Sequence, residues 1–458
     1  MAMNKNILVL AKLYKGDLSP FDACALECAL SIEGASVTLL SMAPPQMEES
    51  LGALTRLGLD AVLLSDPAYA GSDTVATARI LSKAIAHLSP DLIFAGRESE
   101  DGNTAQVPLM LSELTGYALF QKAMSLSDGE LTNRDGESIR LDRKQIITFE
   151  KFRLLRPPSI FSKKKAVRRI DNQTLMLPLG EVGLQGSPTR VVASYPNRDN
   201  RRSCQSVDYA ALDQIIQASL AKEEASGPTR PIEAKATMIH YVGDLKEVAS
   251  SYAEKAEEID VSSCPNTASL CEKIQSSGAK LILWEEAGPI KEKACQVASR
   301  LGLGLCADCT SLRYEDGRFI LTRPALGGDI LADIECLSPI AMATMKAPSN
   351  HKDEVAVIIG RGALPHLDKV RALAARYGAK IYCSRPLADN GEFAYEDQVG
   401  LTGISIAPKV AIAIGVSGAI QHVVGIERSG TIVAINIDKK APIFDYADYG
   451  IVMDAENL

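Results

Sequence analysis

Glycine, hydroxyl and arginine residues follow three predicted strands near the C-terminus. They are Gly360-Arg361-Gly362, Gly415-Val-Ser417-Gly418 and Asn436-Ile-Asp438, and Ser384-Arg385 follows the run Ile381–Cys383 after the first of these strands. In open α/β sheets the carboxyl ends of the strands form the edge where ligands bind. Gly415 and Gly418 would let backbone N–H groups approach a phosphate at a helix start. The spacing is GxxG and not GxGxxG, so ordinary tight turns between strand and helix remain the alternative interpretation.

Alternating strands and helices position these residues. Val355–Ile359, Val410–Ile414 and Thr431–Ile435 are short apolar runs typical of buried strands. Gly378 stands where the C-cap of the first intervening helix is expected. The apolar face of that helix is predicted at Leu364, Leu367, Val370, Leu373, Ala374 and Tyr377. The alternation predicts a doubly wound parallel sheet.

Two loops near the N-terminus are rich in Gly, Asp and Thr. They are Ser65–Thr74 and Gly96–Gln106, and they follow predicted strands at Ala61–Leu64 and Leu92–Ala95. We expect these strands to be neighbours and each loop to open a helix. The two helix N-termini could then hold a nucleotide phosphate together. A pair of well-capped helices with no ligand is the alternative.

Composition limits the class of protein. A chain of 458 residues is too long for one core and predicts about three domains. The net charge of -8 argues against nucleic acid as the main partner. No apolar run reaches the roughly 18 residues of a membrane helix. The N-terminus enters a predicted strand at Ile7 without a secretory signal, so we expect a cytoplasmic location and no membrane span.

The cysteine content agrees with the predicted cytoplasmic location. Ten cysteines in a large chain without a signal peptide predict reduced thiols. Cys306-Ala-Asp-Cys309 is a lone CxxC with no histidine nearby, and we interpret it as two small buried residues beside a strand. We predict no metal site.

The last hundred residues resemble the FAD-binding domain of the electron transfer flavoprotein α subunit. The blocks that carry the resemblance are Ser384-Arg385, Gln398–Gly403, Ala407–Lys409, Gly415–His422, Val433–Asn436, Ala441–Phe444 and Ala447–Ile451. So many ordered blocks make the resemblance specific, and it implies a C-terminal doubly wound FAD-binding domain.

The N-terminal region resembles the β subunit of the same family. The similar blocks are Pro20–Glu27, Met42–Pro45, Ala70–Thr77, Gly96–Gln106 and Gly186–Arg190. In that family this pocket holds AMP, or a second FAD in the electron-bifurcating members. The forms of Ala70–Thr77 and of Thr104-Ala-Gln106 look closer to the bifurcating members. Only eight residues separate Leu10 from Ser19, so we expect the hairpin that usually follows the first strand to be missing.

Residues 232–346 repeat the plan of the first domain. They resemble the α subunit's N-terminal domain through Gly304–Thr310, Thr322–Asp329 and Met342–Met345. The loop Glu285–Pro289 departs from the family pattern, so we expect no nucleotide in this domain.

The resemblance thus implies a single-chain equivalent of an αβ heterodimer. We expect a β-like nucleotide-binding domain with its arm at 1–203, a linker at 204–231, an α N-terminal-like domain at 232–346 and the FAD-binding domain at 347–458. The first two domains are expected to be related, Rossmann-like and adenine-nucleotide-hydrolase-like, with parallel sheets.

The resemblance also implies the roles of site residues. Arg385, as a fixed positive charge near the flavin ring, Thr402 near N5 and His422 facing the pyrimidine carbonyl are the predicted catalytic residues. The predicted FAD contacts are Ser384, Arg385, Gln398, Val399, Gly400, Thr402, Gly403, Gly415, Ser417, Gly418, Ala419, Gln421, His422, Asn436, Asp438 and Asp454. The predicted contacts of the second nucleotide are Asp73, Thr74, Thr77, Asp101, Asn103, Thr104 and Gln106.

These expectations define the predicted function. The chain is expected to shuttle electrons through FAD between a partner dehydrogenase and other redox partners. A second FAD in the β-like domain and NADH-dependent electron bifurcation are expected with it; a simple carrier with one FAD and structural AMP is the alternative. The basic segment 152–165, by resemblance, grips an acyl-CoA dehydrogenase-like or other flavin dehydrogenase.

Overall fold

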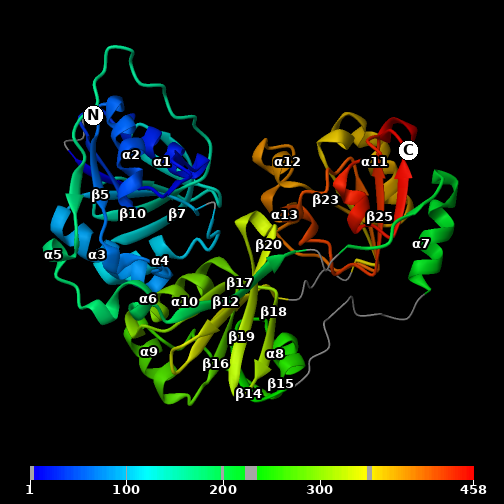
Figure 1. Cartoon of the computed structure of the whole chain (residues 1–458). Helices are drawn as coiled ribbons and strands as arrows, with labels where there is room; N and C mark the ends of the chain where they lie inside the picture. The colour runs from blue at the N-terminus through cyan, green and yellow to red at the C-terminus, as the bar shows by residue number, and fades with distance from the viewer. Residues whose placement is uncertain (1–4, 100, 198–200, 222–234, 348–352) are drawn as a thin grey trace. The chain divides into compact units, whose positions relative to one another are not determined.

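The chain folds into two compact units that are each described by themselves. The computed structural model describes residues 5–99, 101–197, 201–221, 235–347 and 353–458 (Figure 1). Unit 1 comprises Met1–Ala193, Ala236–Leu326 and Ala332–Met345, and unit 2 comprises Ser194–Lys235, Gly327–Leu331 and Lys346–Leu458. The boundaries of the four segments predicted from sequence stay predictions.

The first half of unit 1, up to Ala193, is built on a nine-stranded sheet. The strand order is β11-β5-β4-β1-β6-β10-β7-β8-β9, with parallel pairing from β11 to β7 and antiparallel pairing from β7 to β9. The strands are β1 (Asn6–Leu10), β4 (Ser36–Met42), β5 (Asp60–Leu64), β6 (Leu92–Gly96), β7 (Ala118–Ser127), β8 (Glu130–Asn133), β9 (Ser138–Arg140), β10 (Gln145–Phe149) and β11 (Arg168–Ile170).

Helices cover both faces of this sheet, which explains its apolar strands. Ile7 and Val9 pack with α1 on one face, whereas Leu8 and Leu10 pack with α3 and α4 on the other. A strand buried on both faces is apolar at every position. The helices and 3-10 turns are α1 (Pro20–Leu30), η1 (Pro45–Met47), α2 (Glu48–Leu54), η2 (Thr55–Leu57), η3 (Pro67–Tyr69), α3 (Thr74–Leu88), α4 (Val107–Thr115), α5 (Asn172–Leu175), η4 (Leu179–Glu181) and α6 (Gly183–Gly186).

A short hairpin follows β1, so the expectation that it is missing is wrong. Strand β2 (Leu13–Tyr14) pairs antiparallel with β3 (Asp17–Leu18). Lys15 and Gly16 connect them with φ angles of 53° and 94°. Two consecutive positive φ angles are typical of a two-residue hairpin turn, the tightest kind. Such a hairpin fits within the eight residues between Leu10 and Ser19.

The second half of unit 1 repeats the core of the first with a five-stranded parallel sheet. Its order is β15-β14-β16-β21-β17, which has the connectivity of β4-β1-β6-β10-β7. The elements are β14 (Ala236–Val242), α8 (Lys246–Tyr252), β15 (Ala253–Glu258), α9 (Thr267–Ser276), β16 (Leu281–Glu285), α10 (Gly288–Leu301), β17 (Leu305–Cys309) and β21 (Ala341–Met345). Cys306 and Cys309 are buried on β17, and no cluster of metal-ligating side chains occurs among the described residues.

The two halves share one core and an antiparallel insertion. Helix α4 packs against α10, and Arg300 of α10 forms an ion pair with Glu113 of α4 at 2.7 Å. A further sheet has the order β12-β20-β19-β18, with antiparallel pairing of β18 and β19. Its elements are β12 (Thr189–Pro196), β18 (Ser311–Glu315), β19 (Arg318–Ala325), η6 (Leu326–Gly328) and β20 (Ile330–Cys336).

Unit 2 has a six-stranded parallel sheet of order β13-β26-β25-β24-β22-β23. Residues 204–221, from the predicted linker, add the strand β13 to this sheet and the helix α7 to one of its faces; residues 222–231 of that linker lie outside the described residues. The elements are β13 (Gln205–Ser206), η5 (Tyr209–Ala211), α7 (Leu212–Leu220), β22 (Val355–Ile359), η7 (Arg361–His366), α11 (Leu367–Arg376), β23 (Lys380–Cys383), α12 (Arg385–Asp389), η8 (Tyr395–Asp397), β24 (Val410–Ile414), α13 (Ile420–Val423), β25 (Thr431–Asn436), η9 (Pro442–Tyr446), β26 (Tyr449–Val452) and η10 (Ala455–Asn457).

The predicted α/β fold class is confirmed by these parallel sheets. The core of unit 2 has one layer on each face of its sheet, with α7 and α11 on one face and α13 with the 441–447 segment on the other. In the part of the chain that the structure describes, no helix has the length and apolar character needed to cross a bilayer.

The halves of unit 1 share a strained position at the bulge of β7 and of β17. Lys122 and Asp308 have φ angles of 58° and 54°, and each donates its backbone N–H to a threonine hydroxyl at 2.9 Å. The two threonines, Thr148 and Thr344, occupy the fourth position of β10 and of β21. The shared backbone pattern makes Lys122 and Asp308 structural equivalents of opposite charge.

The charges around the second bulge form a buried cluster. Lys291 of α10 forms an ion pair with Glu286, and its Nζ lies 3.9 Å from a carboxylate oxygen of Asp308. Burial raises the pKa of Glu286. Burial disfavours the charged form of Lys291, but the two carboxylates outweigh it and raise its pKa. One cation therefore holds two acidic groups inside this half of unit 1.

Replacing Lys291 by Met should strongly destabilise unit 1. The substitution keeps the volume of the side chain and leaves two buried carboxylates without their cation, which costs about 3–5 kcal/mol. Trp284 is fully buried on the adjacent strand β16 and is the single tryptophan of the chain, so its fluorescence follows unfolding in urea.

Two further variants interpret the result. Lys280→Met, at an exposed lysine, should change the free energy of unfolding by less than about 0.5 kcal/mol. Adding Glu286→Gln to Lys291→Met should recover part of the loss, because it removes one of the unpaired charges. Equal stability of Lys291→Met and the wild type would contradict the assigned role.

Candidate functional site

The sheet of unit 2 has a topological switch point between β22 and β24. The chain goes from β22 to β23 on one side and then to β24 on the other, which is the strand order of flavodoxin-like sheets. The loops after β22 and β24 meet at this point. A Cβ on Gly360 would lie 2.2 Å from the carbonyl oxygen of Gly415, and a Cβ on Gly415 would lie 2.4 Å from the nitrogen of Ala363. Both positions therefore require glycine.

The loop after β24 presents free backbone donors. Gly415 and Gly418 have φ angles of 61° and 87°, which turn successive N–H groups toward one side. The N–H groups of Val416, Ser417, Gly418 and Ala419 donate to no acceptor in the part of the chain that the structure describes. Val416 is only 2% exposed, and buried N–H groups are rarely unpaired. This arrangement suits an anion such as a pyrophosphate.

The helix after this loop is short. Helix α13 has four residues, Ile420–Val423, so its macrodipole is small. Anion binding at this edge would therefore rely on the individual N–H groups and on electrostatic attraction from side chains, rather than on a long helix.

The loop Gln398–Ile404 places two predicted site residues side by side. Gln398 is 1% exposed, and its Nε2 donates to the hydroxyl of Thr402 at 2.9 Å. The loop closes on itself, because the N–H of Ile404 donates to the carbonyl of Gln398 at 2.8 Å. A Cβ on Gly403 would lie 2.0 Å from the same carbonyl oxygen, so this tight closure requires glycine.

His422 carries a buried nitrogen with no partner. Its Nδ1 lies 3.0 Å from the carbonyl oxygen of Val399. A carbonyl only accepts, so Nδ1 is the donor and Nε2 of the neutral ring is an acceptor. Nε2 is buried and has no hydrogen-bond partner among the described residues. Burial lowers the pKa of His422 to about 4, only partly offset by the bond to Val399.

This tautomer limits the hydrogen bonds that His422 can make to a flavin. The neutral ring can accept a hydrogen bond from a ligand N–H through Nε2. Only the protonated ring could donate to a pyrimidine carbonyl while keeping its bond to Val399.

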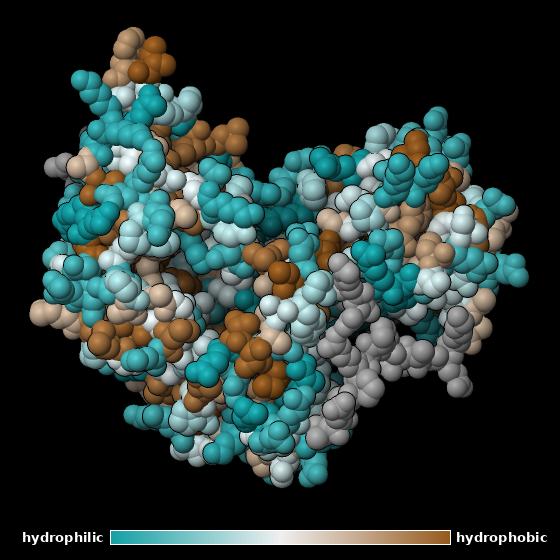
Figure 2. Space-filling model, viewed as in Figure 1, coloured by the Kyte–Doolittle hydropathy of each residue, from teal (hydrophilic) through white to brown (hydrophobic). Residues whose placement is uncertain are grey.

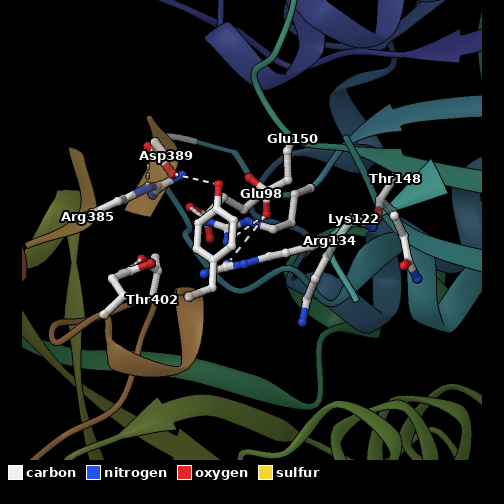
Figure 3. A network of polar contacts seen from close by, with 12 residues as sticks. Glu98, Lys122, Arg134, Thr148, Glu150, Arg385, Asp389 and Thr402 are labelled. Carbon is white, nitrogen blue, oxygen red and sulfur yellow. Dashed lines mark hydrogen bonds and ion pairs between the residues drawn. The ribbon is translucent and has the colours of Figure 1, made fainter. Parts of the chain in front are cut away.

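Arg385 begins α12, at the end of β23. Its Nε lies 3.3 Å from a carboxylate oxygen of Asp389, one helical turn away. Tyr395 donates its hydroxyl to the other oxygen of Asp389 at 3.2 Å. Figure 3 shows Arg385 beside Asp389, with Thr402 on its own loop. The guanidinium is about a quarter exposed and lies at the carboxyl edge of the sheet.

Other predicted contacts hold the backbone. Asn436 donates from Nδ2 to the carbonyl of Val416 at 2.7 Å and accepts the N–H of Asp438. Asp438 accepts the N–H of Lys440, and Asp454 caps the last 3-10 turn. Ser417, Ala419 and Gln421 are exposed, and Ser384 is half-buried. Asn436 thus supports the donor loop, which is a different role from direct ligand contact.

These features of unit 2 fit FAD. The residues from Val416 to Ala419 offer backbone N–H groups to a pyrophosphate, and the buried Nε2 of His422 offers an acceptor to a ring N–H. Arg385 and Thr402 would lie toward the ring.

The N-terminal candidate site lies at a second switch point, between β1 and β6. Strands β5 and β6 are separated by β4 and β1, so the expectation that they are neighbours is wrong. Their loops meet through their helices instead, because the Thr74 hydroxyl of α3 donates to Gln106 at the start of α4 at 3.0 Å. This contact depends on the directions of α3 and α4, which the sequence alone does not give.

Asp73 and Gln106 of this site form hydrogen bonds with other groups of the chain. Asp73 accepts the N–H of Ala76 at 2.9 Å and both the N–H and the hydroxyl of Thr189 at 3.0 and 2.7 Å. Burial raises the pKa of Asp73. Gln106 donates to the carbonyl of Leu305 at 3.3 Å, which ties this loop to the second half of unit 1. These bonds anchor the arm and the helices.

Asp101 is paired across the switch point. Its carboxylate lies 2.6 Å from Lys12, which follows β1. Burial raises the pKa of Asp101, but the hydrogen bond and charge of Lys12 outweigh this effect and lower it overall. Asn103 adopts a left-handed conformation with φ 50°. The hydroxyls of Thr77 and Thr104 make no hydrogen bond within the described part of the chain and remain available to a ligand.

Two groups near this site were missed from sequence. Arg323 of β19 is 8% exposed, donates to the carbonyl of Gly102 at 2.8 Å, and has a buried Nε with no partner among the described residues. Arg323 lies in the block Thr322–Asp329 that resembles the family, but no local pattern links it to Gly102, which is 221 positions away. A buried guanidinium without a carboxylate partner favours an anionic ligand.

The second missed group is a charged network at the ends of β6 and β10. Arg97 lies 3.2 Å from Glu150 and 2.6 Å from Glu98, and Arg134 lies 4.0 Å from Glu150. Figure 3 shows Glu98, Arg134 and Glu150 together with Lys122 and Thr148 on the neighbouring strands. Burial lowers the pKa of Lys122.

The equivalent switch point of the second half, between β14 and β16, is filled by a carboxylate of the chain. Glu285 accepts the N–H of Asp244 at 2.9 Å. A Cβ on Gly243 would lie 2.3 Å from the same carboxylate, so the loop closes tightly around it. An anionic side chain therefore stands where a phosphate would bind.

An exposed loop lies between β10 and β11. Leu154, Ile160 and Phe161 are 94%, 83% and 87% exposed. Arg156 anchors the loop to Glu27 of α1 with an ion pair of 2.6 Å. Figure 2 shows apolar surface at the tip of this protruding segment.

Comparison with known families gives two matches. The electron transfer flavoprotein domain matches residues 7–151 and 246–372. The electron transfer flavoprotein FAD-binding domain matches residues 351–427. The two segments of the first match cover more than half of the chain and fall in the two repeated halves and the start of unit 2.

Individual relatives match parts of the chain. The α and β subunits of an electron transfer flavoprotein from Thermoanaerobacterium thermosaccharolyticum are 36% and 38% identical, over 36% and 40% of this chain and 64% and 77% of their own lengths. A relative from Acetobacterium woodii, "Lactate dehydrogenase (NAD(+),ferredoxin) subunit LctC", is 33% identical over 35% of this chain and 49% of its own length. The chain spans 58–67% of the length of four relatives with 34–36% identity.

His422 should make the stability of unit 2 depend on pH. The pKa of histidine is near 6.5 in the unfolded chain and about 4 in the fold. Between these values only the unfolded chain binds the proton, so the free energy of unfolding should rise by up to about 3 kcal/mol from pH 4 to 6.5 and stay flat above.

Hydrogen exchange of peptides from β24 would measure this effect for unit 2 separately. His422→Asn should remove most of the rise, whereas His87→Asn, at an exposed histidine of unit 1, should retain it. A wild-type profile that is flat between pH 4 and 6.5 would show that His422 is not buried in its neutral form.

Proposed function

Because the chain belongs to the electron transfer flavoprotein family, we propose that it carries electrons through an FAD bound in unit 2. The observation that carries the proposal is the switch point of unit 2. There, four backbone N–H groups and the buried Nε2 of His422 have no hydrogen-bond partner among the described residues. FAD, when bound, supplies transfer of one or two electrons. The protein's part is to orient the ring and to set its electrostatic surroundings.

We further propose that one chain combines a β-like and an α-like part. The family domain matches two separate segments, and the two halves of unit 1 have the same strand connectivity. Relatives named as α and as β subunits both match this one chain. The product would be a single-chain equivalent of a heterodimer.

A second nucleotide is proposed in the first half of unit 1. Two observations support it, namely the buried Nε of Arg323 and the unengaged hydroxyls of Thr77 and Thr104. We propose FAD there, with NADH as electron donor and electron bifurcation as the activity. The name of the LctC relative, which includes NAD(+) and ferredoxin, favours this version. A simple carrier with structural AMP is the alternative, because Asp73 and Gln106 are already bonded internally.

The exposed loop between β10 and β11 is the proposed docking segment for a flavin dehydrogenase. Large apolar side chains that are more than 80% exposed are unfavourable in water unless a partner covers them. The basic residues around them, including Lys163 and Lys164, would favour an acidic partner surface.

Counting released nucleotides tests the proposal. Denatured protein should release one FAD from unit 2 for each chain, quantified by chromatography. A second FAD without AMP, followed by bleaching on titration with NADH, would support bifurcation; one FAD with one AMP would support the simple carrier. A chain that binds no FAD even after reconstitution would overturn the assignment.

Arg385→Gln should lower the midpoint potential of the bound FAD. Loss of a positive charge near the ring removes about 2 kcal/mol of stabilisation from the reduced, more negative form, which is on the order of 40 mV for a two-electron couple. Arg385→Lys should retain more of the potential because it keeps the charge. Arg371→Gln, at an exposed position of α11, should have no effect. An unchanged potential in Arg385→Gln would refute the role of Arg385.

A further inference from the structure

Lys346 makes two short bonds to the loop that carries Thr402. It directly follows β21 and is the residue at which the chain enters unit 2. Its Nζ donates to the carbonyl oxygens of Gly400 and Gly403 at 2.8 and 2.7 Å. Both bonds are charge-assisted, which makes them stronger than bonds between neutral groups. The side chain is half-buried, so water competes less for these bonds than at the surface.

The two carbonyls enclose the segment Leu401–Thr402. Lys346 therefore closes a clamp over the backbone of Thr402, while Gln398 holds its hydroxyl at 2.9 Å. The N–H of Leu401 also donates to the carbonyl of Gln421, next to His422. The ammonium of Lys346 thus holds a loop that contains Thr402, one predicted contact of the flavin ring. The same loop is hydrogen-bonded to the residue next to His422, a second predicted contact.

The backbone of this loop needs such a clamp. Gly400 has a φ of 141°, and a Cβ there would lie 2.7 Å from the carbonyl oxygen of Gln421. Glycine is required for that close approach, but it also gives the unfolded loop more conformational freedom. A cation that binds two carbonyls at once restricts this freedom without adding bulk.

We propose that Lys346 is a positioning residue of the flavin site. Its ammonium fixes the backbone from Gly400 to Gly403, which sets the position of Thr402 and places a fixed positive charge beside the loop. This inference rests on the proposed FAD site of unit 2. A compact ammonium suits the task, because it can direct separate N–H groups to two carbonyls.

The test compares Lys346→Met with the wild type. Without the ammonium, amide exchange at Gly403 and Ile404 should accelerate about tenfold in the FAD-free chain. In the FAD-loaded chain, the affinity for reduced relative to oxidised FAD should fall about tenfold, which corresponds to about 30 mV for a two-electron couple. Lys346→Arg should restore most of the potential. Lys409→Met, at a surface lysine of unit 2 paired with Glu354, should behave as the wild type.

Each result decides a part of the inference. Unchanged amide exchange in Lys346→Met would show that the clamp does not hold the loop. Faster exchange with an unchanged potential would leave Lys346 a merely structural residue and overturn its role toward the flavin. If Lys346→Met does not fold, Lys346→Gln, which also removes the charge, is measured instead: a potential about 30 mV below that of the wild type supports the role of the charge, and an unchanged potential contradicts it. Failure of the wild-type chain to bind FAD would overturn the proposed function itself.

Discussion

The need to satisfy backbone N–H groups at the carboxyl ends of parallel strands governs this structure. A parallel sheet with a switch point leaves N–H groups in the two diverging loops without strand partners. This constraint arises at three switch points of the chain. Asp22 accepts the N–H groups of Gly96 and Lys12 in the first half of unit 1, and Glu285 accepts that of Asp244 in the second half. In unit 2 no described residue accepts the N–H groups of Val416 to Ala419 in the loop after β24.

This comparison ranks the candidate sites. An internal carboxylate at a switch point satisfies the N–H groups and repels a phosphate, so direct phosphate binding is disfavoured there. Unit 2 has no such carboxylate among its described residues, which makes it the strongest candidate for a dinucleotide. In the first half of unit 1 a ligand would have to lie toward the N-termini of α3 and α4, beside Arg323.

The repeated halves of unit 1 show how one backbone serves two chemistries. Lys122 and Asp308 have the same left-handed conformation and the same bond to a threonine hydroxyl, but opposite charge. In the second half the cluster around Lys291 neutralises itself inside the fold. In the first half, Arg97 and Arg134 lie beside the carboxylates of Glu98 and Glu150 at the carboxyl edge of the sheet. The bulge is a backbone feature, whereas its use depends on which side chain it carries.

The sequence by itself determined the elements whose local pattern is strong. The strands Val355–Ile359 and Val410–Ile414 were predicted with the observed bounds, because both faces are buried and every position is apolar. Gly378 ends α11 with a φ of 61°, a conformation that glycine adopts at little cost. The tertiary structure alone decided which distant groups meet. Strand β13 and helix α7 join unit 2 from the segment predicted as a linker, and Lys346 and Arg323 reach loops 54 and 221 positions away. These contacts depend on the path of the whole chain, and no local periodicity encodes them.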